Sequence, residues 1–448
     1  MLSEKKSILS LTTIFFLILF IRNANAQTFG PGQDTTKETV LFIHPGIEDS
    51  TYKNNSAGEF TPGRGFEMVK SKYGSLNISI YAMCRYLNQL PGEQTWYDHL
   101  GRERQLTGRN DFYWHRTMIW FSGFVIDPKV TYNAAVWTIM PTQQTLVYGQ
   151  ISYALNKHAR FSIGVGPNLC IRSMLGPFPF YSSTDRTMGE DAMRGGFTQG
   201  LWVSGEIFPK LKYWLMLGNN LSTLGIQASK LTRDLSKSAS IWWMPTTGEF
   251  GPRGGIGDFE EHQKLATRFG ASFCHSREDR FNNTGQPAPD NTQVRLTDGV
   301  LAFETGALAD SVTVDKANYD FLSVDLGWKY KGFGLEAEFF GRKLSHFLAD
   351  GELPLSDIND YAYTVQASYM AVHKILCVYA VNTYFWDEWK RHPYEIGGGV
   401  NLYATKSRSW RVNAQVMYVY KTAAGGTFGL YTAGQTGPTI TLGTDILL

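Results

Sequence analysis

The sequence lacks long apolar runs, clustered cysteines and an excess of either charge, and each absence excludes a class of protein. After residue 26 no segment stays apolar for about 18 residues, which excludes membrane proteins built from spanning helices. The four cysteines lie far apart, without Cys-x-x-Cys or disulfide-framework spacing, and are expected to be small strand residues. Removal of residues 1–26 leaves equal numbers of basic and acidic residues, so overall charge does not favour nucleic acid as a partner.

The N-terminus has the three parts of a secretory signal peptide. Lys5 and Lys6 precede an apolar run over residues 8–21, and Ala24-Asn25-Ala26 forms a small-x-small cleavage site. We therefore expect residues 1–26 to be removed and the mature chain to begin at Gln27. The alternative is an anchor helix, but the apolar run is shorter than the roughly 20 residues that span a bilayer.

Alternation of apolar and polar residues is the strongest structural signal in the chain. From Trp410 to Tyr420 the even positions are apolar or aromatic, while Arg411, Asn413 and Gln415 face the other way. The same pattern occupies residues 76–85 and runs to the end of the chain over residues 439–448. Repeated strands of about ten residues with one apolar face are typical of transmembrane barrels.

These strands predict the fold class, the domains and the location. We predict a transmembrane antiparallel β-barrel of about 16 strands over residues 73–448, preceded by a mostly irregular leader over residues 27–72. A signal peptide followed by such a barrel indicates the bacterial outer membrane.

Tight turns are expected at one end of the barrel and longer loops at the other. The tight turns are predicted at residues 127–129, 156–158, 209–210, 331–332, 373–374 and 406–408. The longer loops, rich in Gly, Asn, Asp and Pro, are predicted at 88–111, 171–196, 276–318, 346–359 and 422–437. The weakest stretch is 222–262, where the Gly-rich run 251–257 requires an unusually long connection at the turn end. Tryptophans near strand ends are predicted to form interfacial girdles, among them Trp114, Trp137, Trp328, Trp386 and Trp410.

Charged residues on the polar face of the predicted strands should line the interior of the barrel. The basic ones are Arg85, Arg116, Arg160, Lys212, Arg268, Lys329, Arg342 and Arg411. The acidic ones are Glu206, Asp325, Glu336, Glu338, Glu395 and Asp445. Two interpretations stay open: either opposite charges pair across the barrel without strong selectivity, or the arginines form a path for oxyanions, which a guanidinium binds through two parallel hydrogen bonds.

Several short motifs resemble a known family. They are residues 73–77, residues 85–89, Arg116 ahead of Ser122-Gly123, residues 127–132, and residues 180–200 with Asp185-Arg186. Together they are similar to the phosphate-selective porin O and P-like family of outer-membrane porins over most of residues 73–448. The resemblance implies a sixteen-stranded, usually trimeric channel in which the third long loop folds into the lumen and arginines line an anion path.

The resemblance also implies which loop residues form the constriction. By position the third long loop corresponds to residues 171–196. Its candidates are Arg172, Arg186 and Arg194, with Asp185, Glu190 and Asp191 as counter-charges. The sequence departs from the family in having no traceable uninterrupted ladder of arginines, so phosphate selectivity does not follow from the resemblance.

The leading functional hypothesis is a passive diffusion channel for small anionic or neutral solutes, as a homotrimer among outer-membrane lipid and lipopolysaccharide. One alternative is a barrel enzyme of the lipase or acyltransferase type, for which only His115 and His346 are candidate catalytic residues. Another is a structural or adhesive barrel, which a filled lumen would distinguish. No cofactor, metal site or nucleic-acid partner is predicted, since no ligand spacing occurs among the histidines and cysteines.

Overall fold

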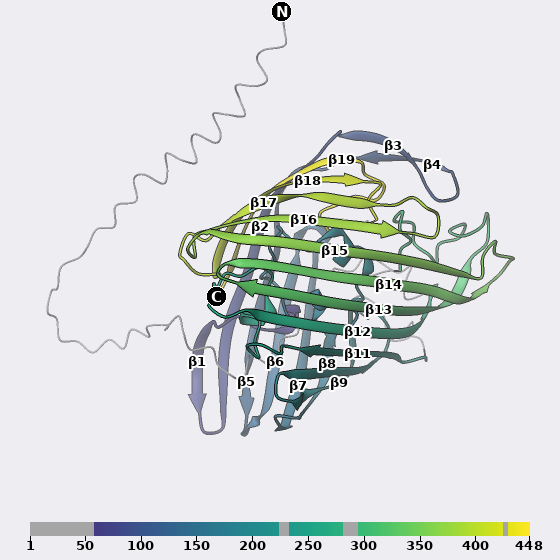
Figure 1. The fold of residues 1–448 in the computed structure, drawn as a ribbon. Coiled ribbons are helices and arrows are strands. Elements are labelled where there is room, and N and C mark those ends of the chain that lie inside the picture. The colour runs from purple at the N-terminus through teal and green to yellow at the C-terminus, as the bar shows by residue number, and fades with distance from the viewer. Residues whose placement is uncertain (1–57, 224–232, 281–293, 424–428) are drawn as a thin grey trace, which may run out of the picture. The chain divides into compact units, whose positions relative to one another are not determined.

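One large antiparallel sheet dominates the computed structural model, which describes residues 58–223, 233–280, 294–423 and 429–448 (Figure 1). Sixteen strands within these ranges close into a ring, because Thr439–Leu447 of the last strand pair with residues 81–89 of β2. The ring strands are β2 Gly74–Gln89, β5 Asn110–Val125, β6 Asp127–Ile139, β7 Gln144–Asn156, β8 Ala159–Pro167, β9 Phe197–Phe208, β10 Leu211–Gly218, β11 Ser236–Trp243, β12 Ala266–Asp279, β13 Val314–Tyr330, β14 Phe333–Ala349, β15 Asp357–Val372, β16 Leu376–Trp386, β17 Tyr394–Leu402, β18 Trp410–Tyr420 and β19 Gly437–Leu447.

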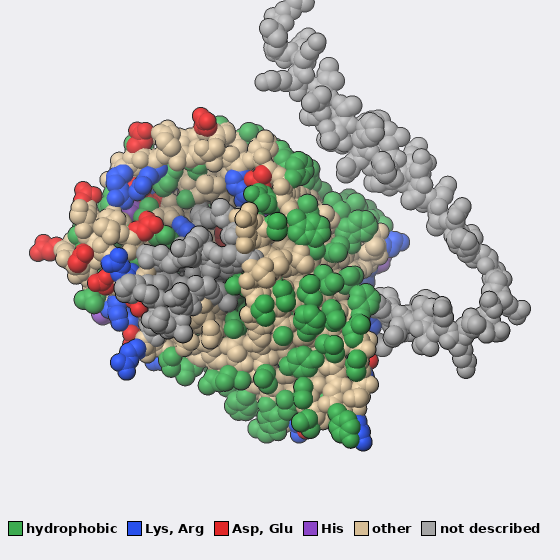
Figure 2. All heavy atoms as spheres, turned by 180° about the vertical axis from the view of Figure 1, so that it is seen from behind, with side chains coloured by type: hydrophobic (Ala, Val, Ile, Leu, Met, Phe, Trp, Pro, Cys, Tyr) green, Lys and Arg blue, Asp and Glu red, His purple; other side chains and the backbone are tan. Residues whose placement is uncertain are grey.

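The closed ring confirms the predicted barrel of about 16 strands. Closure gives every wall strand a partner on both sides, which is the condition for crossing lipid with strands. The outer face is apolar at such positions as Phe273, Leu322 and Phe339, and Figure 2 shows apolar side chains gathered over the wall. This architecture places the chain in a bacterial outer membrane. No helix within the described ranges is both long and apolar enough to cross a membrane.

The two ends of the ring differ in their connections. At one end β7 and β8 are joined by Lys157-His158, and β13 and β14 by Lys331-Gly332, as predicted. The predicted turn at residues 127–129 is wrong by a few residues, because the chain reverses at Ile126, which has a φ of 66°, and β6 already begins at Asp127. Proline is tolerated in the first residues of a strand, so Pro128 belongs to β6.

Three strands lie where the sequence analysis placed none. β1, Phe66–Ser71, belongs to the leader range and pairs with residues 74–78 of β2. β19 pairs with the same edge of β2 further along the strand, at residues 81–89. β3, Glu93–Tyr97, and β4, Glu103–Thr107, form a hairpin inside the predicted loop 88–111. These strands are short, and five or six residues give too little alternation to be recognised. The predicted signal peptide and the leader up to residue 57 lie outside the described residues.

The main apolar cluster lies on the inward side of the ring. Met118 and Trp120 of β5, Trp137 of β6 and Trp202 of β9 are buried there. Trp137 is therefore not part of an interfacial girdle, whereas Trp114, Trp386 and Trp410 are exposed on the outer face. Tryptophan suits both a headgroup region and a packed interior, and its position near a strand end did not distinguish the two. An apolar inward face needs a partner inside the barrel, because a water-filled lumen is polar.

Candidate functional site

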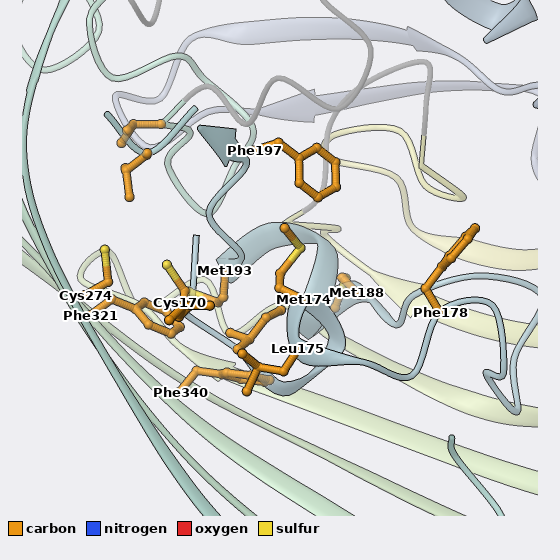
Figure 3. Packing of buried hydrophobic residues seen from close by; sticks show 14 of the residues in the cluster. Cys170, Met174, Leu175, Phe178, Met188, Met193, Phe197, Cys274, Phe321 and Phe340 are labelled. Carbon is orange, nitrogen blue, oxygen red and sulfur yellow. The ribbon is translucent and has the colours of Figure 1, made fainter. Parts of the chain in front are cut away.

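The segment between β8 and β9, residues 168–196, packs against the apolar inward face of the barrel. It contains two short helices, α3 Arg172–Leu175 and α4 Met188–Met193, and nearly all of its residues are buried. Figure 3 shows Met174, Leu175 and Met193 of this segment together with Phe340 of β14, all members of the buried apolar cluster. The segment therefore supplies the apolar surface that the inward faces of the wall require.

Charged contacts tie one part of this segment to the strands at the seam of the ring. Arg116 of β5 forms an ion pair with Asp185. Arg411 of β18 pairs with Asp445 of β19 at 2.9 Å and donates hydrogen bonds to the carbonyls of Tyr181 and Ser183 at 2.6 and 2.9 Å. A guanidinium has five donors, so one arginine can neutralise a carboxylate and still hold a main-chain bend.

Another part of the segment is tied to β14. The Arg172 side chain forms an ion pair with Glu336, and its main-chain N–H donates to Glu338 Oε1 at 3.0 Å. The two glutamates are two residues apart on one face of β14 and receive both contacts. Because β5 and β14 lie in different parts of the ring, segment 168–196 contacts the inward faces of several separate strands.

The other predicted constriction residues have specific partners. Arg186 pairs with Glu59 at 2.6 Å, and Arg194 lies 3.5 Å from Asp191. Glu190 completes a capping box at the start of α4, where its carboxylate accepts from the Thr187 N–H at 2.9 Å. Glu190, predicted as a counter-charge in the constriction, therefore caps the N-terminus of α4.

The remaining predicted arginines also lie on the inward face. Arg268 pairs with Asp325 at 2.7 Å, and Arg342 pairs with Asp360 at 2.6 Å. Arg85 donates to the Gly429 carbonyl at 2.7 Å. Arg160 is half-buried near the tight-turn end and donates to Thr131 Oγ1 at 2.9 Å. The ion pairs of Arg268 and Arg342 join adjacent strands, so these charges do not face each other across an open lumen. Their role in an anion path stays a prediction.

A second segment inside the ring was missed as a structural element. Residues 249–258, here called the inner hook, belong to the long connection between β11 and β12 at the tight-turn end. The Ile256 N–H donates to the Phe180 carbonyl at 2.7 Å, and Arg172 donates to the Gly254 carbonyl at 2.8 Å. Lys329 of β13 donates to the Phe250 carbonyl at 2.9 Å. The long connection expected at residues 251–257 is present, but its glycine run did not predict that the connection turns into the barrel.

A cavity of about 390 Å³ lies between the inner hook, α3 and the ends of β9 to β12. Its basic lining residues are Arg172, Lys210, Lys212, Arg253 and Arg268. Its acidic lining residues are Glu206 and Glu249. Lys210 lies in the tight turn between β9 and β10, so the cavity is at the tight-turn end of the ring. Glu336 and Asp325 offset Arg172 and Arg268, which leaves three basic lining residues against two acidic ones. This small positive excess favours anions.

His262 fastens the base of the inner hook. Its Nδ1 contacts Asp258, and its Nε2 lies 3.0 Å from a Glu249 carboxylate oxygen. Burial by itself would lower the pKa of His262, but the hydrogen bonds to Asp258 and Glu249 raise that pKa to about 9. The imidazolium is thus the charge that holds two carboxylates together at neutral pH.

We expect the stability contributed by His262 to be lost at alkaline pH. Its pKa is higher in the folded than in the unfolded chain, so the contribution is complete below the ordinary value of 6.5 and disappears as pH rises through about 9. Thermal unfolding of detergent-solubilised barrel between pH about 6 and about 10 measures this. In His262→Asn the unfolding temperature should change less between these two pH values than in the unmodified chain. His158→Asn, on the exposed turn between β7 and β8, should show the same pH dependence as the unmodified chain. Parallel curves for the two variants would contradict this role.

No protein-family model and no curated protein matches the sequence. Among solved structures, outer-membrane OmpT of Vibrio cholerae aligns over 85% of this chain and 99% of its own, with 10% identity and a TM-score of 0.52. An anion-selective porin from Comamonas acidovorans aligns over 84% of this chain and 100% of its own, with 10% identity and a TM-score of 0.50. The chain has a porin fold. The comparisons extend to porins in general and do not support the phosphate-selective family in particular.

Within the porin fold the two candidate histidines of an enzyme are far from a shared site. His115 is buried on the inward side, next to the bulge where β5 has one residue more than β2. His346 is exposed on the outer face, where its carbonyl accepts from Arg277 at 2.7 Å. A nucleophile and base must lie within hydrogen-bond reach of each other, so these residues give no common catalytic centre.

Proposed function

We propose that the protein is an outer-membrane porin that passes small hydrophilic solutes and prefers anions. The observation that carries the proposal is the cavity of about 390 Å³ at the tight-turn end, lined by five basic and two acidic residues. In membrane barrels this end faces the periplasm. The cavity borders α3 of segment 168–196, so that segment and the inner hook together set the narrowest part of the path.

The chemistry of the lining supports oxyanions among the anions. Guanidinium forks match the oxygens of phosphate or carboxylate better than a single-point cation does. The forks of Arg172 and Arg268 already bind Glu336 and Asp325, so an oxyanion would compete with these carboxylates, whereas the Arg253 fork has no carboxylate partner among the described residues. Trp242 lies at the same cavity, with the Arg268 guanidinium 5.4 Å from the centre of its ring, a cation–π contact that helps to position this guanidinium. A homotrimer in contact with outer-membrane lipid and lipopolysaccharide is part of this proposal.

Single-channel recording in a planar bilayer tests the proposal. Under a salt gradient we expect discrete steps whose reversal potential indicates anion selectivity, and added phosphate should reduce the current because it competes for the arginine-lined cavity. Steps without charge preference would leave a general porin and remove the anion preference. Absence of steps in both the unmodified chain and the Glu59→Gln variant described below would remove the channel function.

One observation favours a structural barrel as the second candidate. Segment 168–196, the inner hook and residues 59–63 all lie inside the ring, so its described interior is largely filled. A filled lumen is the feature expected of a structural or adhesive barrel. The filling comes from short segments of the barrel chain itself, and the recordings above distinguish the two candidates.

A further inference from the structure

Residues 59–63, here called the plug segment, lie inside the ring although they belong to the leader. All five are buried, with Glu59 at 0% and Phe60 at 4% exposure. The first two belong to the short 3₁₀ turn η1, Gly58–Phe60, and the segment precedes β1. The leader therefore contributes a piece of the barrel interior, which its polar composition does not indicate.

The apolar part of the plug segment joins the wall to segment 168–196. The Phe60 ring lies 4.7 Å from the ring of Tyr148 on β7 and 4.9 Å from the ring of Phe197, where segment 168–196 enters β9. Such tilted and edge-on aromatic contacts stabilise beyond the area that they bury. Phe60 thus fills space on the apolar inward side of the barrel.

Side chains of the surrounding structure make polar contacts with Glu59, Phe60 and Pro62 of the plug segment. Trp120 donates to the Glu59 carbonyl at 2.9 Å, Asn133 donates to the Phe60 carbonyl, and Arg253 of the inner hook donates to the Pro62 carbonyl. The Glu59 carboxylate pairs with Arg186 of segment 168–196 through Oε1, while Oε2 has no hydrogen-bond partner among the described residues. The plug segment therefore touches the wall, the inner hook and segment 168–196 at once. A buried carboxylate oxygen without a hydrogen bond is unfavourable, so it weakens the preference of the plug segment for its buried position.

The chain enters the interior at a defined place. A Cβ on Gly63 would lie 2.0 Å from the carbonyl oxygen of Leu448, and one on Gly65 would lie 2.1 Å from that of Ile78. Gly65 also has a φ of +58°. Only glycine allows so close a passage between the C-terminus and β2, after which β1 fixes the chain to the wall. Release of the plug segment would break side-chain contacts and leave the strand ladder of the barrel intact.

We propose that the plug segment is a releasable closure of this channel, held shut by the Glu59–Arg186 ion pair. The proposal rests on the channel function proposed above. In the closed state the plug segment fixes segment 168–196 and the inner hook in the positions described here. When it leaves, Arg186 and Arg253 lose their partners in the plug segment and face the path, so the open state is wider and more cationic.

Thiol labelling tests the release without relying on conduction. In a chain whose four cysteines are replaced by alanine, Thr61→Cys should react with a water-soluble thiol reagent about a hundredfold more slowly than Lys72→Cys on the exposed β1–β2 turn. Adding Glu59→Gln should speed labelling of Thr61→Cys about tenfold, because Arg186 loses its ionised partner. The matched control is Glu67→Gln, whose carboxylate pairs with Lys70 on the surface at 3.3 Å. Equal labelling of Thr61→Cys and Lys72→Cys would overturn the plug.

Recordings on the same variants separate the plug from the channel. Glu59→Gln should raise the mean current severalfold over the unmodified chain and over Glu67→Gln. Equal currents in all three would overturn the closure and leave the channel standing. No current in any variant, with faster labelling of Thr61→Cys in Glu59→Gln, would overturn the channel and with it the gating role. Heat-modifiable migration in gels confirms folding, and Phe60→Ala replaces Glu59→Gln if that variant does not fold.

Discussion

Replacing Arg411 by glutamine is expected to destabilise the barrel more than any other single change at its interior charges. Arg411 is 5% exposed, pairs with Asp445 and holds the carbonyls of Tyr181, Ser183 and Thr184. Its loss leaves Asp445 buried without its cation, and removing one partner of a buried pair costs about 3–5 kcal/mol of the free energy of unfolding. Segment 168–196 also loses an anchor, so its thermal motion and the channel current should both increase.

Urea unfolding in lipid vesicles, followed by tryptophan fluorescence, measures this loss. The control is Arg277→Gln on the outer face of β12, where the guanidinium donates to Asn318 and to the His346 carbonyl near solvent. That change should cost about 1 kcal/mol or less. The double variant Arg411→Gln with Asp445→Asn should recover part of the stability, because no unpaired charge remains. Equal losses for Arg411→Gln and Arg277→Gln would show that the interior pair is not buried as described.

Replacing Arg172 by glutamine is expected to change charge selectivity more than any other substitution in the cavity. Arg172 joins three parts of the interior: α3, Glu336 of β14 and the Gly254 carbonyl of the inner hook. Its loss removes one of five basic lining residues and leaves the Glu336 carboxylate without its cation, a change of one charge unit. We expect the anion-to-cation permeability ratio to fall roughly tenfold.

The reversal potential under a salt gradient measures this ratio. Arg172→Lys is the matched variant, because it keeps the positive charge and loses the planar fork. It should retain most of the charge selectivity while weakening block by phosphate, which depends on the fork. If Arg172→Gln and Arg172→Lys shift the reversal potential equally, the charge of Arg172 does not set selectivity and the solute path lies elsewhere.

Much of the wall could be predicted from the sequence because a strand has a period of two and lipid surrounds it. In β18 the alternation from Trp410 to Tyr420 assigns Arg411 to the inside, and the structure places it there. A slip by one residue would turn every apolar side chain of that strand to the interior, so the pattern determines which residues point inward and which point outward. The turns at residues 157–158 and 331–332 follow from the same alternation together with their turn-forming residues.

The bulge in β5 could not be predicted from the alternation of apolar and polar residues. His115 and Arg116 are neighbours in the chain, yet both are buried on the inward side, because β5 has one residue more than β2 at this point. A bulge depends on the strand beside it and has no fixed signature in one sequence. Trp137 illustrates a related failure, since it packs inside the barrel against Tyr148 of the neighbouring β7 and against Phe197, with ring centroids 6.4 and 5.7 Å away.

By itself the sequence determined the approximate number of wall strands, the outward and inward faces of most of them and the membrane environment, because these depend on local alternation and on lipid. Only the tertiary structure decided what fills the ring. Segment 168–196, the inner hook and the plug segment have no periodicity. Their partners lie far along the chain: Asp185 is 69 residues from Arg116, Glu59 is 127 from Arg186, and Tyr181 is 230 from Arg411. The closed ring brings those side chains into one low-dielectric interior, where a buried charge needs a partner.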